Sequence, residues 1–392
     1  MRLSVTQDQT NLGTRRTIHL TEVADGHDIS AYFDFPDEQL PEPDLYDGFV
    51  NAFIFHAMRI GEPIKVDGPM SRDAVLNLAT FQEAWSCWRP DHYKRVDINP
   101  TKIVHQTTYS TSLAIGAFSG GVDSIFTATR HAENSLGNAS YGLGSVLLVH
   151  GFDVPLDRDD QFDALVSREK PLLDELGLRL RTVKTNLKDA APQAWEDSFL
   201  ALLSSCLFNL SHEFRYALIG SGEPYNALVL PWGQNPCTDH LLSGSSFMVV
   251  HEGAAFSRTE KVAEIVKRAT AIKAVKVCWE GPDPSTNCGS CEKCVRTRLN
   301  FAAVGCKDPE CFEGPLTKEL IASIAPFNSY QISELQLILD YVDKRHIRKP
   351  WVAALRKRVR FLKANQIGRA MMLLKDGRVD QIASKLLRRL SG

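Results

Sequence analysis

Short apolar runs alternate with amphipathic stretches through the middle of the chain. The apolar runs predict five strands, at residues 112–118, 145–150, 178–183, 216–220 and 246–251. The amphipathic stretches predict the helices between and after them, at residues 122–132, 158–176, 196–212 and 259–269. Strands that alternate with helices are typical of βαβ units, whose parallel sheet is covered by helices on both faces. The pattern therefore predicts an α/β fold with a doubly wound parallel sheet.

The two ends of the chain follow different patterns. The first part combines two alternating, strand-like stretches with two helical ones, at residues 16–23, 28–35, 47–58 and 71–88. Beyond residue 305 the periodicity is helical only, over residues 333–342, 351–364 and 368–390. We therefore expect an α+β N-terminal extension, an α/β core and a basic helical C-terminal region, at residues 1–108, 109–305 and 306–392.

The composition is that of a globular protein, but the charge is unevenly distributed. Of 392 residues, 44% are hydrophobic and 23% are charged, which excludes a disordered, collagen-like or coiled-coil chain. The net charge is −2, yet residues 344–392 carry 15 Lys and Arg against two Asp, so the other residues carry −15. Basic helices of this kind could bind nucleic acid, an acidic protein or anionic lipid. They could also dock on the acidic remainder of this chain or of a second copy, and we expect a homodimer.

Membrane insertion and secretion are not expected. No apolar run approaches the ~18 residues that a membrane span requires, and the first residues lack the apolar core of a signal peptide. Nine cysteines, three of them within seven residues, do not suit a disulfide framework. The sequence therefore predicts a cytoplasmic protein with reduced thiols, some of which bind a metal.

A glycine-rich loop joins the first predicted core strand to its helix. The loop reads Ser-Gly-Gly-Val-Asp-Ser, and paired glycines let backbone N–H groups approach a ligand closely. The helix N-terminus that follows favours an anion such as phosphate, and an aspartate beside phosphate needs Mg²⁺ between them. A turn capped by Asp and Ser is the structural alternative. The residues that we expect to contact the ligand are Phe118, Ser119, Gly120, Gly121, Val122, Asp123 and Ser124.

Four cysteines form the second motif. The spacing is Cys-x₉-Cys-x₂-Cys-x₂-Cys, and its members are Cys278, Cys288, Cys291 and Cys294. Four thiolates suit tetrahedral Zn²⁺ with no open coordination position, which is the arrangement of a structural metal centre. An iron–sulfur cluster is the competing interpretation, because the same ligands also hold iron.

The two motifs together resemble a known enzyme family. The loop matches the SGGxDS motif of the N-type ATP pyrophosphatases, and the added cysteine motif resembles the 7-cyano-7-deazaguanine synthase (QueC) family over about residues 111–305. The resemblance implies an adenine nucleotide alpha hydrolase-like (HUP) core. It implies that ATP adenylates a carboxylate of a 7-deazaguanine, that pyrophosphate leaves, and that ammonia displaces AMP. A second adenylation then yields the nitrile. The implied ligands are ATP, Mg²⁺ and Zn²⁺.

The reaction needs cationic groups that stabilise the charge developing on phosphate. Arg258 and Lys261, close together at the start of a predicted helix, are the candidates, and Asp123 and Asp239 complete the predicted catalytic set. A solvated helix face is the structural alternative for the two cations. Asp239 could instead cap the segment that follows it.

The chain departs from the family in its two extensions, which nitrile synthesis does not explain. Family members with extensions occur in bacterial defence-associated gene sets, where a deazaguanine can be attached to a protein. The acceptor can therefore be ammonia or another amine. Two alternatives stay open: a tRNA-thiolating enzyme, for which Cys237 is the candidate thiol, and a nucleotide-binding accessory protein without turnover.

Overall fold

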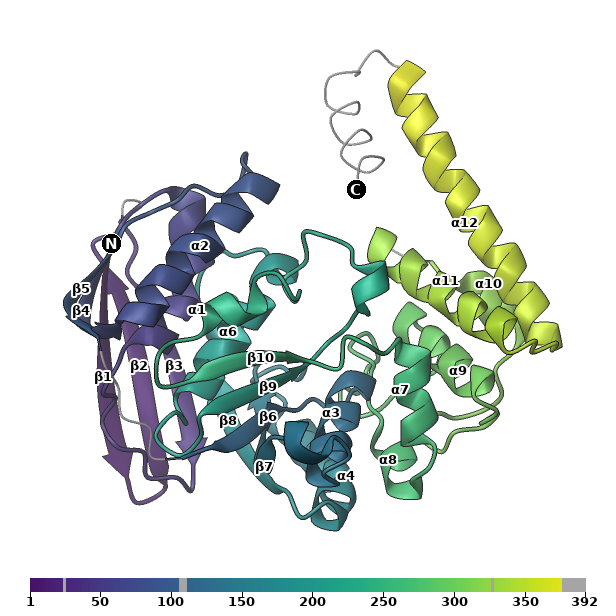
Figure 1. Cartoon of the computed structure of the whole chain (residues 1–392), viewed down its shortest axis with the longest axis horizontal. Helices are drawn as coiled ribbons and strands as arrows, with labels where there is room; N and C mark the ends of the chain where they lie inside the picture. The colour runs from purple at the N-terminus through teal and green to yellow at the C-terminus, as the bar shows by residue number, and fades with distance from the viewer. Residues whose placement is uncertain (24–25, 106–110, 326–327, 376–392) are drawn as a thin grey trace.

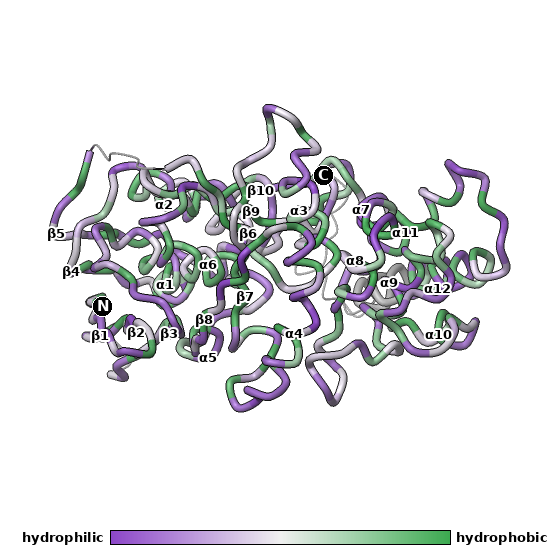
Figure 2. Tube along the Cα trace, turned by 90° about the horizontal axis from the view of Figure 1, so that it is seen from below, coloured by the Kyte–Doolittle hydropathy of each residue, from purple (hydrophilic) through white to green (hydrophobic). Residues whose placement is uncertain are grey.

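The computed structural model describes residues 1–23, 26–105, 111–325 and 328–375. Its strands form one ten-stranded sheet in the order β10-β9-β6-β7-β8-β3-β2-β1-β4-β5 (Figure 1). The predicted α/β class is confirmed, and most neighbouring strands in the sheet run parallel. The two halves of the sheet and the C-terminal helices follow one another along the long axis of the molecule (Figure 2).

The predicted core forms the parallel half of the sheet. Its strands are β6 (Leu113–Ala117), β7 (Gly142–His150), β8 (Arg179–Thr185), β9 (Tyr216–Gly220) and β10 (Met248–Glu252). Its helices are α3 (Val122–Ala132), α4 (Asp159–Glu175), α5 (Leu187–Ala190), α6 (Trp195–Phe208), α7 (Arg258–Ile265) and α8 (Ala269–Ala274). The chain progresses from β6 to β8 in one direction and then continues with β9 on the other side of β6. In open α/β sheets, ligands bind at the carboxyl ends of the strands at such a reversal.

The first part of the chain extends the same sheet. Its elements are β1 (Arg2–Thr10), β2 (Gly13–Thr21), β3 (Ile29–Pro36), α1 (Asp47–Ile60), β4 (Ile64–Ser71), α2 (Arg72–Trp88) and β5 (Ile98–Val104). Strand β3 pairs antiparallel with β8, and α1 packs against α6. Apolar residues of both parts share one core. The sheet thus crosses the predicted boundary between residues 108 and 109, and the division into regions stays a prediction.

The last part of the described chain is helical. The periodicity predicts this beyond residue 305, but it did not predict the helices at residues 292–303 and 318–323. The helices of this part are α9 (Glu292–Ala303), α10 (Lys318–Ser323), α11 (Ser329–Lys344) and α12 (Pro350–Lys375). They share an apolar core of their own, and α12 extends away from the body of the molecule (Figure 1). The predicted helix at 351–364 and the beginning of that at 368–390 form the single helix α12, while residues 376–390 lie outside the described residues. Among the helices described, none is both long and apolar enough to cross a bilayer.

Candidate functional site

The glycine-rich loop lies at the carboxyl end of β6, where the strand order reverses. Helix α3 begins at Val122 directly after the paired glycines, so its free N–H groups face the loop. Gly120 has φ +69°, and its carbonyl accepts a hydrogen bond from the Lys276 backbone N–H at 2.8 Å. A Cβ atom at Gly120 would collide with the Glu169 carboxylate. Only glycine therefore fits this turn without strain.

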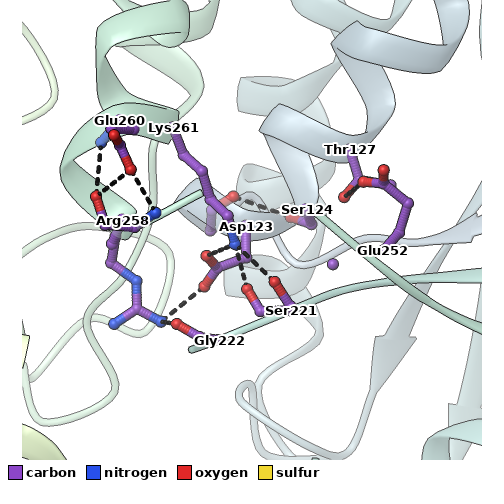
Figure 3. Close-up of polar contacts among 12 residues, drawn as sticks. Asp123, Ser124, Thr127, Ser221, Gly222, Glu252, Arg258, Glu260 and Lys261 are labelled. Atoms are coloured by element: carbon purple, nitrogen blue, oxygen red, sulfur yellow. Dashed lines mark hydrogen bonds and ion pairs between the residues drawn. The ribbon is translucent and has the colours of Figure 1, made fainter. Parts of the chain in front are cut away.

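Asp123 brings the predicted cations together. Its carboxylate pairs with the Arg258 guanidinium at 2.7 Å and with the Lys261 ammonium at 3.0 Å (Figure 3). The Lys261 ammonium also donates to the hydroxyl and the carbonyl oxygen of Ser221 at the end of β9. Burial alone would raise the pKa of the Asp123 carboxyl, but the two cations outweigh burial and hold that pKa below its usual value. The solvated-face interpretation of Arg258 and Lys261 is wrong, because both side chains are buried.

A cavity of about 90 Å³ opens against this loop. It is lined by Ser119, Gly121, Val122, Asp123, Ser124, Arg258, Val277, Lys293 and Thr297. Two members of the predicted ligand set, Phe118 and Gly120, are not part of the lining. Three lining residues, Val277, Lys293 and Thr297, were not predicted. Of these three, only Lys293 could have been singled out from the sequence, because it lies inside the cysteine motif.

Lys293 adds a cation whose environment is unusual. Burial lowers the pKa of its ammonium to about 8, because Asp153 offsets burial only in part and nearby cations such as Arg258 repel a further positive charge. Lys293 and Thr297 lie four residues apart on α9, so both reach the cavity from one helix face. The cavity thus collects hydroxyl, guanidinium and ammonium donors around a helix N-terminus, an arrangement suited to a phosphate group.

Two buried titratable side chains lie behind the loop. The Glu169 side chain is fully buried, and neither of its oxygens has a hydrogen-bond partner among the described residues. The Lys276 ammonium is likewise buried without a partner among them. Burial raises the pKa of Glu169 to about 8, although Arg168 and Lys276 counteract this shift. Glu169 is therefore largely protonated at neutral pH and adds little negative charge behind the loop.

Asp239 lies apart from these groups. Its carboxylate is fully buried, accepts a hydrogen bond from the Asn235 backbone N–H at 2.7 Å and pairs with His251 Nδ1 at 2.6 Å. It is the first residue of the short 3₁₀ helix Asp239–Leu242, whose cap position is Thr238, and its side chain does not line the cavity. The structure does not bring Asp239 to the loop, so its catalytic role stays a prediction. Cys237, the candidate thiol for tRNA thiolation, is exposed and also lies outside the cavity lining.

The four cysteines of the second motif form one cluster. All four Sγ atoms lie within 4.8 Å of one another, with Cys278 and Cys291 3.8 Å apart and Cys288 and Cys294 3.9 Å apart. Bonds of ~2.3 Å to a tetrahedral Zn²⁺ place two sulfurs about 3.8 Å apart. The Cys291 and Cys294 backbone N–H groups donate to the Cys288 and Cys291 sulfurs, which stabilises thiolates. The cluster could hold a metal ion such as zinc.

A comparison of the chain with protein-family models, curated proteins and solved structures finds no match. The family resemblance therefore rests on the two sequence motifs and their spacing, and it stays a prediction.

Proposed function

We propose that the chain is an ATP-dependent, AMP-forming ligase that adenylates a carboxylate, of a 7-deazaguanine-type substrate, for attack by ammonia or another amine. The observation that carries this proposal is the cavity at the carboxyl end of β6. The loop, the N-terminus of α3 and the side chains of Arg258 and Lys293 converge there on a cavity of about 90 Å³. The strand order of the parallel half supports an adenine nucleotide alpha hydrolase-like core.

The chemistry needs two displacements. A carboxylate oxygen of the substrate attacks the α-phosphorus of ATP, the bond between the α-phosphorus and the bridging oxygen breaks, and pyrophosphate leaves with that oxygen. The amine nitrogen then attacks the acyl carbon, AMP leaves, and the nitrogen releases a proton. Arg258 and Lys293 are positioned to stabilise the charge that accumulates on the pyrophosphate oxygens.

The residues present also fit Mg²⁺ and Zn²⁺. Asp123 is the carboxylate of the cavity, and it could hold Mg²⁺ that arrives with the nucleotide and supplies positive charge for the leaving group. The cysteine cluster surrounds the start of α9, since Cys291 is its N-cap residue. If these cysteines hold a metal, it would supply structural stabilisation, because it would fix the start of the helix that carries Lys293 and Thr297 into the cavity.

The test is product analysis with the purified chain. ATP, Mg²⁺, ammonium and 7-carboxy-7-deazaguanine are incubated together, alongside a panel of other carboxylates, and the products are identified by mass spectrometry. We expect AMP and pyrophosphate in amounts that depend on the carboxylate, with an amide or nitrile product. Formation of ADP and phosphate would refute the proposal. Nucleotide binding without turnover on any carboxylate would instead favour the accessory-protein alternative.

A further inference from the structure

Arg258 is held by two carboxylates, Asp123 and Glu334, that lie more than 200 residues apart in the sequence. One nitrogen of its guanidinium, Nη2, pairs with Asp123 of the phosphate loop at 2.7 Å. The other, Nη1, pairs with Glu334 of α11 at 2.7 Å. Glu334 belongs to the region that the sequence marks as an appended helical extension, and its side chain is only 3% exposed. A cavity-lining cation of the core thus has a buried counter-ion in the C-terminal helices.

One carboxylate oxygen of Glu334 accepts hydrogen bonds from two guanidinium groups. Its Oε2 accepts from Arg258 and also from Arg296 of α9, the latter at 3.1 Å. Arg296 in turn pairs with Glu292 at 2.7 Å, beside the cysteine cluster. The charges therefore alternate from the loop through α7 and α11 to α9. In a buried setting the two guanidiniums repel each other strongly unless the carboxylate lies between them.

A second side chain of α11 fixes the same guanidinium. The Tyr330 hydroxyl lies 3.1 Å from Arg258 Nη2. The ring of Tyr330 stacks on that of Trp232 with their centroids 5.1 Å apart and their planes at 8°. Trp232 belongs to the loop after β9. The stacking therefore packs the beginning of α11 against the core beside the cavity. Both contacts restrict where the guanidinium of Arg258 can point.

We propose that helix α11 completes the phosphate site, and that Glu334 is a positioning residue that holds Arg258 at the cavity. The inference rests on the phosphate site of the proposed function. Without the Glu334 charge, Arg296 repels Arg258, and the guanidinium loses the contact that balances Asp123. Arg258 then turns towards Asp123 alone and binds an incoming phosphate less well. The C-terminal helices are, on this view, part of the binding machinery and not an independent appendage.

The experiment measures binding and not turnover. Inorganic pyrophosphate and ATP are titrated into the full chain by calorimetry, for the unmodified protein, Glu334→Gln, Glu334→Asp and the control Gln336→Ala. Gln336 lies on the same helix and contacts Asp340 and Lys363 instead of the cavity. We expect at least ten-fold weaker pyrophosphate binding for Glu334→Gln, partial recovery for Glu334→Asp because the charge returns on a shorter side chain, and unchanged binding for Gln336→Ala.

A double-mutant cycle separates positioning from general structural damage. If Glu334 acts through Arg258, then Glu334→Gln changes pyrophosphate affinity by less than two-fold once Arg258→Ala is present. An undiminished effect in that background would show that Glu334 does not act through Arg258, and the inference would be wrong. Equal binding by the unmodified protein and Glu334→Gln would also overturn it.

Two further outcomes distinguish a failure of this inference from a failure of the proposed function. If the unmodified protein binds neither pyrophosphate nor ATP, the proposed phosphate site itself is refuted. If Glu334→Gln does not fold, as its thermal melt would show, Tyr330→Phe replaces it. That variant keeps every charge and the stacked ring but removes the hydroxyl beside Arg258, and we expect about three-fold weaker binding that disappears in the Arg258→Ala background. Unchanged binding by Tyr330→Phe would then count against the role of α11.

Discussion

At the scale of single residues, Asp123 is the group on which the candidate site depends. It is the one carboxylate that lines the cavity among the described residues, and it neutralises both Arg258 and Lys261. In the absence of a ligand, these ion pairs hold the cations in place. In the proposed function, a phosphate that enters the cavity would compete with Asp123 for Arg258. Asp123 therefore holds the cations in position, and the strength of its ion pairs determines how easily these cations can move towards a ligand.

We expect Asp123→Asn to abolish most of the pyrophosphate release while the chain stays folded. The amide has the same shape but loses the charge that pairs with Arg258 and Lys261 and that could hold Mg²⁺. Loss of one electrostatic group at such a site lowers the rate by roughly 100-fold or more. Pyrophosphate is measured with a coupled assay and the fold with circular dichroism. Asp163→Asn, on the exposed face of α4, is the control that should keep full activity. Unaltered turnover by Asp123→Asn would exclude a direct part in the reaction.

The raised pKa of Glu169 predicts how the free energy of unfolding of the chain depends on pH. The pKa of its carboxyl is raised from 4.5 to about 8 by burial, so the folded chain keeps a proton that the unfolded chain releases. Between these two values the folded state binds more protons, and the stability contributed by this group falls as the pH rises. Glu169→Gln removes the titration, and the variant should therefore gain stability relative to the unmodified chain between pH 5 and about pH 8. Thermal melts of both proteins at the two pH values measure the difference, and a constant difference would contradict the prediction.

The residues of the candidate site differ in how far the sequence could predict them. The glycine-rich loop could be recognised because its candidate ligand groups are consecutive, and the cysteine cluster because its cysteines repeat at short spacing. Thr297 and Glu334 could not, since each is an ordinary position within a helix, and Lys293 is marked only by its place inside the cysteine motif. Their part in the site depends on how three helices pack, which no local pattern encodes.

At the scale of elements, helix α9 connects the cysteine cluster to the cavity. Its N-cap is Cys291, and Lys293 and Thr297 follow within the next two turns. The first turn of the helix is therefore held by the same sulfurs that could bind the metal. A change in the geometry of the cluster should therefore also move Lys293 and Thr297 at the cavity.

Loss of the metal should consequently weaken phosphate binding as well as stability. We expect Cys288→Ser to reduce the bound zinc measured by elemental analysis, to lower the melting temperature and to weaken pyrophosphate binding in calorimetry. Cys306→Ser is the matched control, because Cys306 lies outside the cluster and should leave metal content unchanged. Zinc loss with unaltered pyrophosphate affinity would show that the cluster does not fix α9.

The elements that the sequence predicted best are those with unbroken periodicity. Helix α3 and strand β9 have the predicted bounds, whereas β4 and β5 were not predicted. Strand β4 contains Gly68 and Pro69, and its pairing with β5 shifts register between Val66 and Pro69. Glycine and proline inside a strand interrupt the alternation that identifies it. Strand β5 lies at the edge of the sheet with no fully buried residue, so its sequence has no strong apolar pattern.

At the scale of the whole molecule, the sequence gives no indication that the sheet is continuous. Phe33 and Asp34 of β3 pair with Thr185 and Lys184 of β8, about 150 residues later in the chain. Arg181 of the same strand forms a buried ion pair with a residue of the first part, Glu38. Such pairings depend on register between distant segments, and local periodicity contains no information about them. The structure predicts that both halves of the sheet unfold together.

A substitution at the contact between α1 and α6 tests this cooperativity. A Cβ atom at Gly48 of α1 would overlap the Phe208 side chain at the end of α6, so Gly48→Ala overpacks the junction, which typically costs about 1–3 kcal/mol. Because the two halves share one core, we expect faster hydrogen exchange in peptides of β9 as well as of β2. Gly144→Ala, on β7 with open space around the added methyl group, should leave exchange at the junction unchanged. Acceleration confined to residues before 108 would instead support a separately folding N-terminal domain, and the shared core would then contribute little to the stability of the parallel half.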